Sequence, residues 1–115
     1  MNKKEIIKEY KNQKHPAGLF IVKNLQENKI FIGKSLNLPA KIRGITFEVE
    51  MGSYAYSNLA QDFKRLGKEK FEILILDQIE VKDETDKELS SELETLEDMW
   101  VKKLKNEGIT FYNKK

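Results

Sequence analysis

One glycine turn in the first half of the chain could bind an anion. The turn is Gly33-Lys34-Ser35, and a helix is predicted to begin just after it, near Ser35 or Asn37. Either side chain can accept hydrogen bonds from the free N–H groups at a helix start. Such a helix aims backbone donors and the Lys34 charge at one point, which suits a phosphate. A phosphate-binding P-loop is excluded, because the earlier glycine of G-x-x-x-x-G-K-S would fall at Asn28.

A single acidic residue, Glu97, is the second candidate for chemistry. It lies one helical turn from both Leu93 and Val101 in a predicted helix, at the flank of that helix's apolar face. A carboxylate held at the edge of a core is unfavourable unless something pairs with it. The partner could be a divalent cation, or a lysine or arginine from the basic helix of the first half. Helix position alone favours the salt bridge.

The basic residues are concentrated in the first part of the sequence. Residues 1–70 carry 14 Lys or Arg against 7 Asp or Glu, whereas residues 71–115 carry 7 against 12. The first part could therefore present a basic face to phosphates, although solvated helix faces would account for the same lysines. Residues 64 and 65 also complement the dipole of a predicted helix end. The candidate nucleic-acid-binding residues are Lys34, Ser35, Lys41, Arg43, Lys64 and Arg65.

Several regular elements must position these residues. Two short apolar runs, Gly18 to Val22 and Lys29 to Gly33, are joined by a polar segment and predict a β-hairpin. A helix is predicted from about Asn58 to Leu66, with Gly67 at its end. The run from Phe71 to Ile79 is rich in β-branched and aromatic residues, and it predicts a central strand covered on both faces.

The remaining segments give weaker patterns. Residues Lys3 to Lys14 have apolar positions at helical spacing and predict a short helix that ends before the first proline. His15 precedes that proline, and without a carboxylate partner it is interpreted as a turn residue rather than a general base. Ile45 to Val49 alternates like a strand. Leucines from Leu89 to Leu104 predict a final helix, which Gly108 ends.

Length and composition define the class of protein. The 115 residues are enough for one domain with one core, and too few for two. Charged residues make up 35% and hydrophobic residues 39%, as in soluble globular proteins. The chain has no cysteine, which excludes disulfides and thiolate zinc sites. The first residues lack the apolar core of a signal peptide, and no apolar run could span a membrane, so a cytoplasmic location is expected.

The hairpin, the Gly-Lys-Ser turn and the following basic helix together resemble the GIY-YIG nuclease superfamily. Gly18-Leu19-Phe20 matches its first motif and Phe31-Ile32-Gly33 its second. Phe71 to Leu76 is similar to the third strand, Glu97 to the metal-binding glutamate of the last helix, and Asn113 to the closing asparagine. The order and spacing of these pieces carry the resemblance.

The resemblance implies a small α+β domain with a mainly antiparallel three-stranded sheet flanked by helices. Its core would span residues 18–113, preceded by a helix within residues 1–15. It also favours a helix over a strand at residues 45–49. No internal repeat or linker suggests a second domain.

In this family, phosphodiester hydrolysis is divided among three groups. A motif tyrosine helps to activate the attacking water, an arginine on the next helix stabilises charge on the phosphate, and the glutamate holds one divalent ion, Mg²⁺ or Mn²⁺. The resemblance assigns that last role to Glu97. The two motif tyrosines are Phe20 and Phe31 here, and phenylalanine has no hydroxyl. Lys41 stands where the arginine is expected, although Arg43 could serve if the helix register is shifted.

These departures bear directly on activity. Loss of a positioned general acid or base lowers a rate by about 10²–10⁴-fold, and replacing an arginine by lysine weakens phosphate stabilisation further. Tyr54, Tyr56 or His15 could replace the missing group, and metal-bound water could need no side-chain base. Spacing supports none of these alternatives.

The resulting expectation is a GIY-YIG-like domain that binds nucleic-acid backbone, with hydrolytic activity weakened, altered or lost. DNA is the expected partner, although the sequence does not distinguish it from RNA. The alternatives are an active Mg²⁺- or Mn²⁺-dependent endonuclease and a protein-interaction adaptor on a degenerate nuclease fold. A separate protein could supply targeting, and the oligomeric state stays open.

Overall fold

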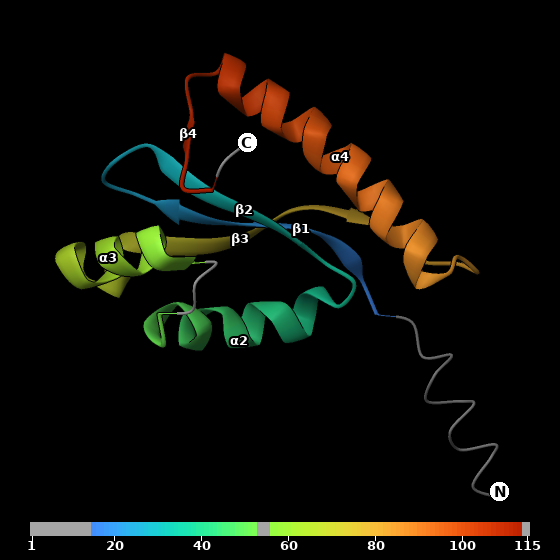
Figure 1. The fold of residues 1–115 in the computed structure, drawn as a ribbon, viewed down its shortest axis with the longest axis horizontal. Helices are drawn as coiled ribbons and strands as arrows, with labels where there is room; N and C mark the ends of the chain where they lie inside the picture. The colour runs from blue at the N-terminus through green and yellow to red at the C-terminus, as the bar shows by residue number, and fades with distance from the viewer. Residues whose placement is uncertain (1–14, 53–55, 114–115) are drawn as a thin grey trace, which may run out of the picture.

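The structure is a computed structural model that describes residues 15–52 and 56–113. The helix predicted at residues 3–14 lies outside the described residues, as does Tyr54. Within them, a four-stranded sheet is covered by helices α2 and α3 on one face and by helix α4 on the other (Figure 1). None of the helices in this part of the chain has the length and apolar character needed to cross a membrane.

Strand β1 (Ala17–Asn24) is the centre of the sheet. It pairs antiparallel with β2 (Lys29–Ser35) on one side and with β3 (Phe71–Ile79) on the other. The predicted hairpin is confirmed. A two-residue strand, β4 (Thr110–Phe111), joins β2 in parallel and gives the order β3-β1-β2-β4. The sheet therefore has one strand more than predicted, because β4 is too short to leave a pattern in the sequence.

The central position predicted for residues 71–79 is wrong. These residues form a strand, but β3 lies at the edge of the sheet, and Ile75 is 49% exposed. In β1, by contrast, all residues except Lys23 are buried. A run of β-branched and aromatic residues fits an edge or a central strand, and the pattern does not contain the pairing that decides between them.

Helix α2 (Leu38–Glu50) begins where the turn residues predict. The Asn37 side chain accepts a hydrogen bond of 3.2 Å from the N–H of Ala40 and caps the helix. The helix continues through residues 45–49, so their strand-like alternation is overridden. Ile45 and Val49 are fully buried one turn apart, which shows that the helical face packs on the sheet.

The two remaining helices of the described residues lie where they were predicted, although α4 begins at Asp86, three residues before its first leucine. Helix α3 (Ser57–Leu66) ends at Gly67, whose φ of 90° favours glycine, and a short 3-10 turn, η2 (Lys68–Lys70), leads into β3. Helix α4 (Asp86–Asn106) is capped by the Thr85 side chain and ends before Gly108.

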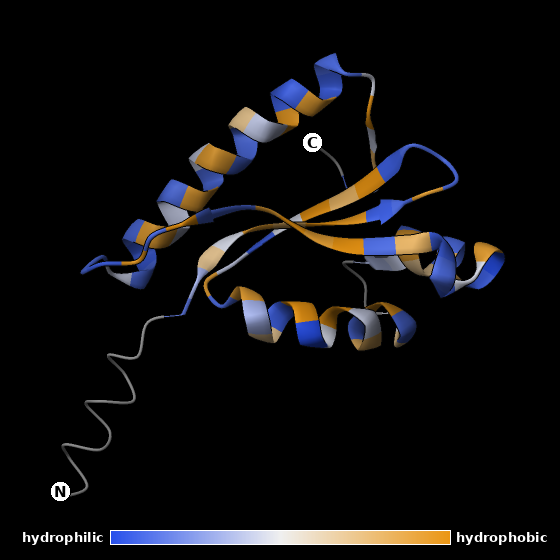
Figure 2. Cartoon of the chain, turned by 180° about the vertical axis from the view of Figure 1, so that it is seen from behind, coloured by the Kyte–Doolittle hydropathy of each residue, from blue (hydrophilic) through white to orange (hydrophobic). Residues whose placement is uncertain are grey.

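The core has two layers, one on each face of the sheet. Phe20, Val22 and Phe31 pack under α2 and α3, whereas Ile21 and Ile32 pack against α4. Figure 2 shows this concentration of hydrophobic residues along the strands between amphipathic helices. Both motif phenylalanines are thus core residues of the layer under α2 and α3.

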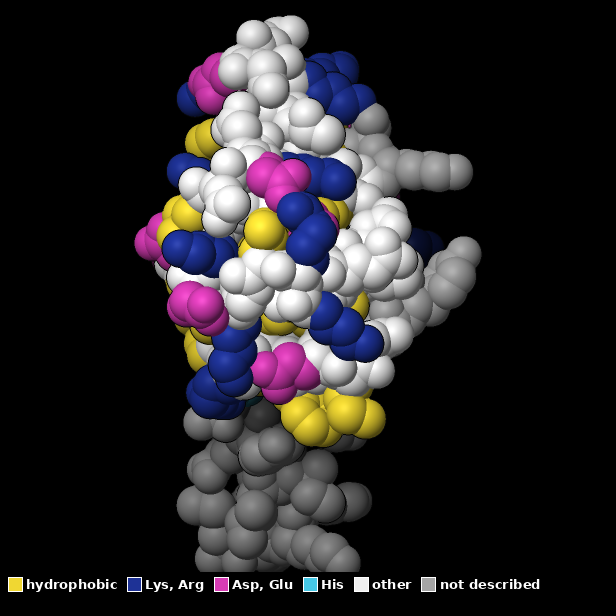
Figure 3. All heavy atoms as spheres, turned by 90° about the vertical axis from the view of Figure 1, so that its left-hand side faces the viewer, with side chains coloured by type: hydrophobic (Ala, Val, Ile, Leu, Met, Phe, Trp, Pro, Cys, Tyr) yellow, Lys and Arg dark blue, Asp and Glu magenta, His cyan; other side chains and the backbone are white. Residues whose placement is uncertain are grey.

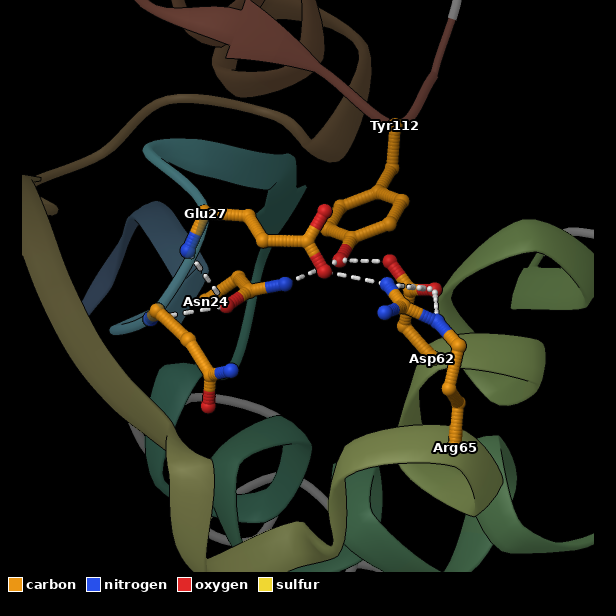
Figure 4. A network of polar contacts seen from close by, with 6 residues as sticks. Asn24, Glu27, Asp62, Arg65 and Tyr112 are labelled. Atoms are coloured by element: carbon orange, nitrogen blue, oxygen red, sulfur yellow. Dashed lines mark hydrogen bonds and ion pairs between the residues drawn. The ribbon is translucent and has the colours of Figure 1, made fainter.

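A network of polar side chains, here called the hairpin clasp, joins the β1–β2 turn to α3 and to the C-terminal segment (Figure 4). Its members are Asn24, Glu27, Asp62, Arg65 and Tyr112. The Tyr112 hydroxyl donates to Asp62 Oδ2 over 2.6 Å and accepts from Asn24 Nδ2 over 3.0 Å. Arg65 pairs with Asp62 over 2.9 Å and also with Glu27. The clasp fixes the position of Tyr112 and hence that of Asn113, the next residue in the chain.

Candidate functional site

Glu97 is a buried carboxylate in the middle of α4. It is 4% exposed, while Glu94 and Asp98 on the same helix face solvent as predicted. Its Oε1 lies 3.7 Å from the ammonium Nζ of Lys34. The basic partner considered from the sequence is thus present, but it belongs to strand β2 and not to the basic helix.

Lys34 reaches Glu97 because of strand alternation. Ile32 faces α4, and Lys34 lies two positions further along β2, so its side chain lies on the same face. The side chain is 36% exposed. The next residue, Ser35, accepts a hydrogen bond of 3.0 Å at Oγ from the N–H of Asn37. This bond shapes the turn into α2, so the Ser35 hydroxyl has a local structural partner.

Asn113 lies on the outer edge of β2, beside the second motif. Its side-chain amide donates to the Ile32 carbonyl over 2.7 Å, and its Oδ1 accepts from the Ile32 N–H over 3.4 Å. The side chain thus continues the pairing that β4 begins. The second half of β2 thus contacts Asn113 at Ile32 and Glu97 at Lys34.

The donor set around Glu97 is sparse for a metal ion. In the described part of the chain, no group of three or more His, Cys, Asp and Glu side chains could hold one. Mg²⁺ nevertheless often binds through one or two carboxylates, substrate phosphates and several waters. Glu97 fits such an ion as its single carboxylate ligand, provided that Lys34 moves away from the carboxylate.

Lys41 belongs to a second group, here called the Lys41 cluster, with Glu48 on the same helix, α2, and Tyr56 at the start of α3. Its Nζ lies 2.9 Å from Glu48 Oε2 and 5.6 Å from the centroid of the Tyr56 ring. Burial disfavours the charge, but hydrogen bonds with Tyr56 and Glu48 outweigh it and raise the pKa of Lys41. The hydrogen bond from Lys41 lowers the pKa of Glu48. Lys41 is thus charged and already paired.

Tyr56 brings a hydroxyl close to the second motif. Its ring packs against that of Phe31, with centroids 4.9 Å apart. Burial, opposed by the hydrogen bond with Lys41, raises the pKa of Tyr56, so the phenol is protonated at neutral pH. It can donate a hydrogen bond there, but it is not a ready general base.

The two groups lie on opposite faces of the sheet. Phe31, beside Tyr56, belongs to the layer under α2 and α3, whereas Lys34 and Glu97 lie on the α4 side. The predicted site residues are thus divided between two places. The Lys34–Glu97 pair is one, and Lys41 with its partners is the other.

The other predicted basic residues are dispersed. Arg43 is exposed on α2, and Lys64 is exposed near the end of α3. Arg65 is held by two carboxylates of the hairpin clasp, which gives it a structural role. At the end of the molecule that carries α3 and the hairpin turn, basic side chains are interspersed with acidic ones (Figure 3). The described residues of that face form no continuous basic patch.

Two ion-pair partners were not identified from the sequence, Glu48 for Lys41 and Lys34 for Glu97. Glu48 follows Lys41 by seven residues, two helical turns, and this spacing was the available signal. The pairing of Lys34 with Glu97 joins residues 63 positions apart and gives no local signal.

Comparison with known proteins identifies the fold. No protein-family model matches the sequence, and no curated protein matches it significantly. Two solved structures are similar over 85% of this chain. One is a mutant of the catalytic domain of the intron endonuclease I-TevI, with a TM-score of 0.65, 21% identity and 92% of that chain covered. The other is the catalytic domain of the homing endonuclease I-TevI, with a TM-score of 0.63, 22% identity and 99% covered. The fold predicted from the motifs is thereby confirmed.

Proposed function

We propose that this chain, which has the fold of the GIY-YIG catalytic domain, binds the backbone of nucleic acid and hydrolyses it weakly or not at all. The observation that carries the proposal is that both motif tyrosines are replaced by buried phenylalanines. Phe20 and Phe31 are buried side by side, 1% and 8% exposed, with ring centroids 6.3 Å apart. Neither can accept or relay a proton, so the rate loss of about 10²–10⁴-fold expected for a missing acid or base applies.

Lys34 beside Glu97 and Lys41 on α2 support binding to a nucleic-acid backbone. Lys34 follows the second motif and Lys41 lies in the first turns of α2, and both are partly exposed. Each could exchange its carboxylate partner for a phosphate, because ammonium groups bind either. Arg43, exposed on the same helix, could add a further contact. Such binding would depend on salt and little on sequence, with DNA as the expected partner.

The test is the affinity of the chain for a short fluorescent DNA duplex, measured by anisotropy at several salt concentrations. Lys34→Ala and Lys41→Ala should each weaken binding and reduce the salt slope by roughly one ion. Lys102→Ala, at an exposed position of α4, is the matched control. An affinity that does not change with salt would refute the proposal.

An active endonuclease is the second candidate. Glu97 is kept at a buried position, Asn113 is held at the edge of β2 by its bonds to Ile32, and the similar structures are endonuclease domains. Glu97 would hold one divalent ion, Mg²⁺ or Mn²⁺, which polarises a phosphate and lowers the pKa of bound water. Plasmid nicking with either ion decides this, because cutting that disappears in Glu97→Ala would establish activity.

A third role, as a protein-interaction adaptor, would apply if neither DNA, RNA nor metal changed the melting temperature. We also propose a cytoplasmic location and a separate targeting protein. Both follow from the sequence-based expectation, and co-purification with a nucleic-acid-binding partner would test the second.

A further inference from the structure

We infer that Lys34 is the exchangeable counter-ion of Glu97, and that it competes with divalent cations for this carboxylate. The inference rests on the proposed function in one respect, the assignment of Glu97 as the metal ligand. It adds to the phosphate contact proposed for Lys34 a second role, at the Glu97 carboxylate.

The burial of Glu97 creates the need for a counter-ion. An ionised carboxylate that is 4% exposed is strongly destabilising unless a positive charge or several donors compensate it. Lys34 Nζ, at 3.7 Å, brings that charge from the neighbouring strand. The Lys34 ammonium therefore compensates the charge of this carboxylate in the protein without a metal ion.

The two partners differ in their freedom to leave. Glu97 is fixed within α4. The buried Leu89 lies two helical turns before it, and the buried Val101 lies one turn after it. The side chain of Lys34 is 36% exposed at the end of β2, so its ammonium can swing into solvent on a flexible stem. A divalent ion can then replace the ammonium without moving the backbone.

This competition couples metal to nucleic acid. Because Lys34 pairs with Glu97 for part of the time, the apparent affinity for a divalent ion equals the intrinsic affinity multiplied by the fraction of time that the carboxylate is available. Once displaced, Lys34 is free to contact a phosphate. A phosphate that draws Lys34 away therefore favours the metal ion, and the reverse holds by linkage.

The experiment measures Mn²⁺ binding to the full chain by titration calorimetry, without nucleic acid. If the pair is closed about nine-tenths of the time, Lys34→Met should bind Mn²⁺ about tenfold more tightly than the wild type. Lys34→Gln, which keeps a hydrogen-bond donor beside the buried carboxylate, should also bind more tightly and guards against a folding defect. Lys68→Met is the control, because it breaks a lysine pair with the exposed Glu50 and should leave the affinity unchanged.

The outcomes separate this inference from the proposed function. Equal Mn²⁺ affinity in the wild type and in both Lys34 variants, with binding lost in Glu97→Gln, would refute the competition while leaving Glu97 as the ligand. Mn²⁺ binding that survives Glu97→Gln would overturn the ligand assignment as well. Absence of Mn²⁺ binding in all folded variants would also overturn both, whereas salt-dependent DNA binding would remain a separate result.

Discussion

Tyr112→Phe should destabilise the protein by removing the central hydroxyl of the hairpin clasp. That hydroxyl bonds to Asn24 and Asp62, which come from the first hairpin and from α3. Asn24 is 1% exposed and the Asp62 side chain 15% exposed, so water can replace the hydroxyl only in part. The aromatic ring remains, so the change tests the polar contacts and not the packing.

The magnitude follows from the groups that lose a partner. A buried donor or acceptor left unsatisfied costs about 1–3 kcal/mol, and the bond to the Asp62 carboxylate lies at the upper end of that range. Two such groups would together cost about 2–6 kcal/mol, and partial replacement of the hydroxyl by water brings the expected loss in the free energy of unfolding to about 2–4 kcal/mol. For a domain of this size, each kcal/mol lowers the Tm by about 4 °C, so a fall of roughly 8–16 °C is expected.

The effect should also depend on pH. Burial opposes ionisation of Asp62, but hydrogen bonds from Tyr112 and Arg65 outweigh it and lower the pKa of this carboxyl group. A lowered folded-state pKa stabilises the protein above about pH 4, the unfolded value, and that stability is lost as the pH falls. Burial and the bond to Asp62 raise the pKa of Tyr112, so its contribution is present below about pH 10 and is lost as the pH rises.

Urea unfolding followed by circular dichroism, at pH 3, 7 and 10.5, measures these differences. Tyr56→Phe is the matched control, since Lys41 and Glu48 lie 2.9 Å apart and each keeps the other as a charged partner when the Tyr56 hydroxyl is removed. The Tyr56→Phe variant should lose less than about 1 kcal/mol in the free energy of unfolding. The reasoning fails if Tyr112→Phe matches the wild type at pH 7 within about 0.5 kcal/mol, the range of an ordinary surface substitution.

Three further changes test other contacts. Glu48→Gln removes the charge that holds Lys41 and should tighten DNA binding severalfold in anisotropy titrations; an unchanged affinity would exclude Lys41 from the interface. Gly33→Ala would place a methyl group against the Phe20 ring and should lower stability by about 1–3 kcal/mol in urea melts, and a neutral result would show that the ring can move. Leu38→Ala, at a fully buried position of α2, should cost about 2–5 kcal/mol in the same assay, so a smaller loss would contradict tight packing there.

Local patterns in the sequence predicted most of the elements. Turn and cap residues such as Asn37 and Gly67 act within a few positions, so the start of α2 and the end of α3 could be derived from them. The strand-like alternation at residues 45–49 misled, because a helix that lies on a sheet also buries residues at a spacing of four. There the resemblance to a family was needed.

Contacts between distant segments could not be predicted in the same way. The edge position of β3 depends on pairing with β1, and β4 exists only because residues 110–111 meet β2. For the site, the flank position of Glu97 predicted its need for a partner, but the choice of Lys34 depends on the packing of α4 over β2. The sequence thus indicated that Glu97 needs a positively charged partner, whereas only the fold identifies that partner as Lys34.

The edge position of β3 has a consequence for handling the protein. An edge strand nine residues long, with Leu74 and Ile75 exposed, is a template on which unfolded chains could add and begin to aggregate. Charged residues at Glu72 and Asp77 interrupt the apolar run near its two ends and act as gatekeepers against that addition. Neutralising the exposed Glu72 should shorten the time for which concentrated solutions stay clear, whereas neutralising Asp77 would also weaken its hydrogen bond from the Trp100 indole.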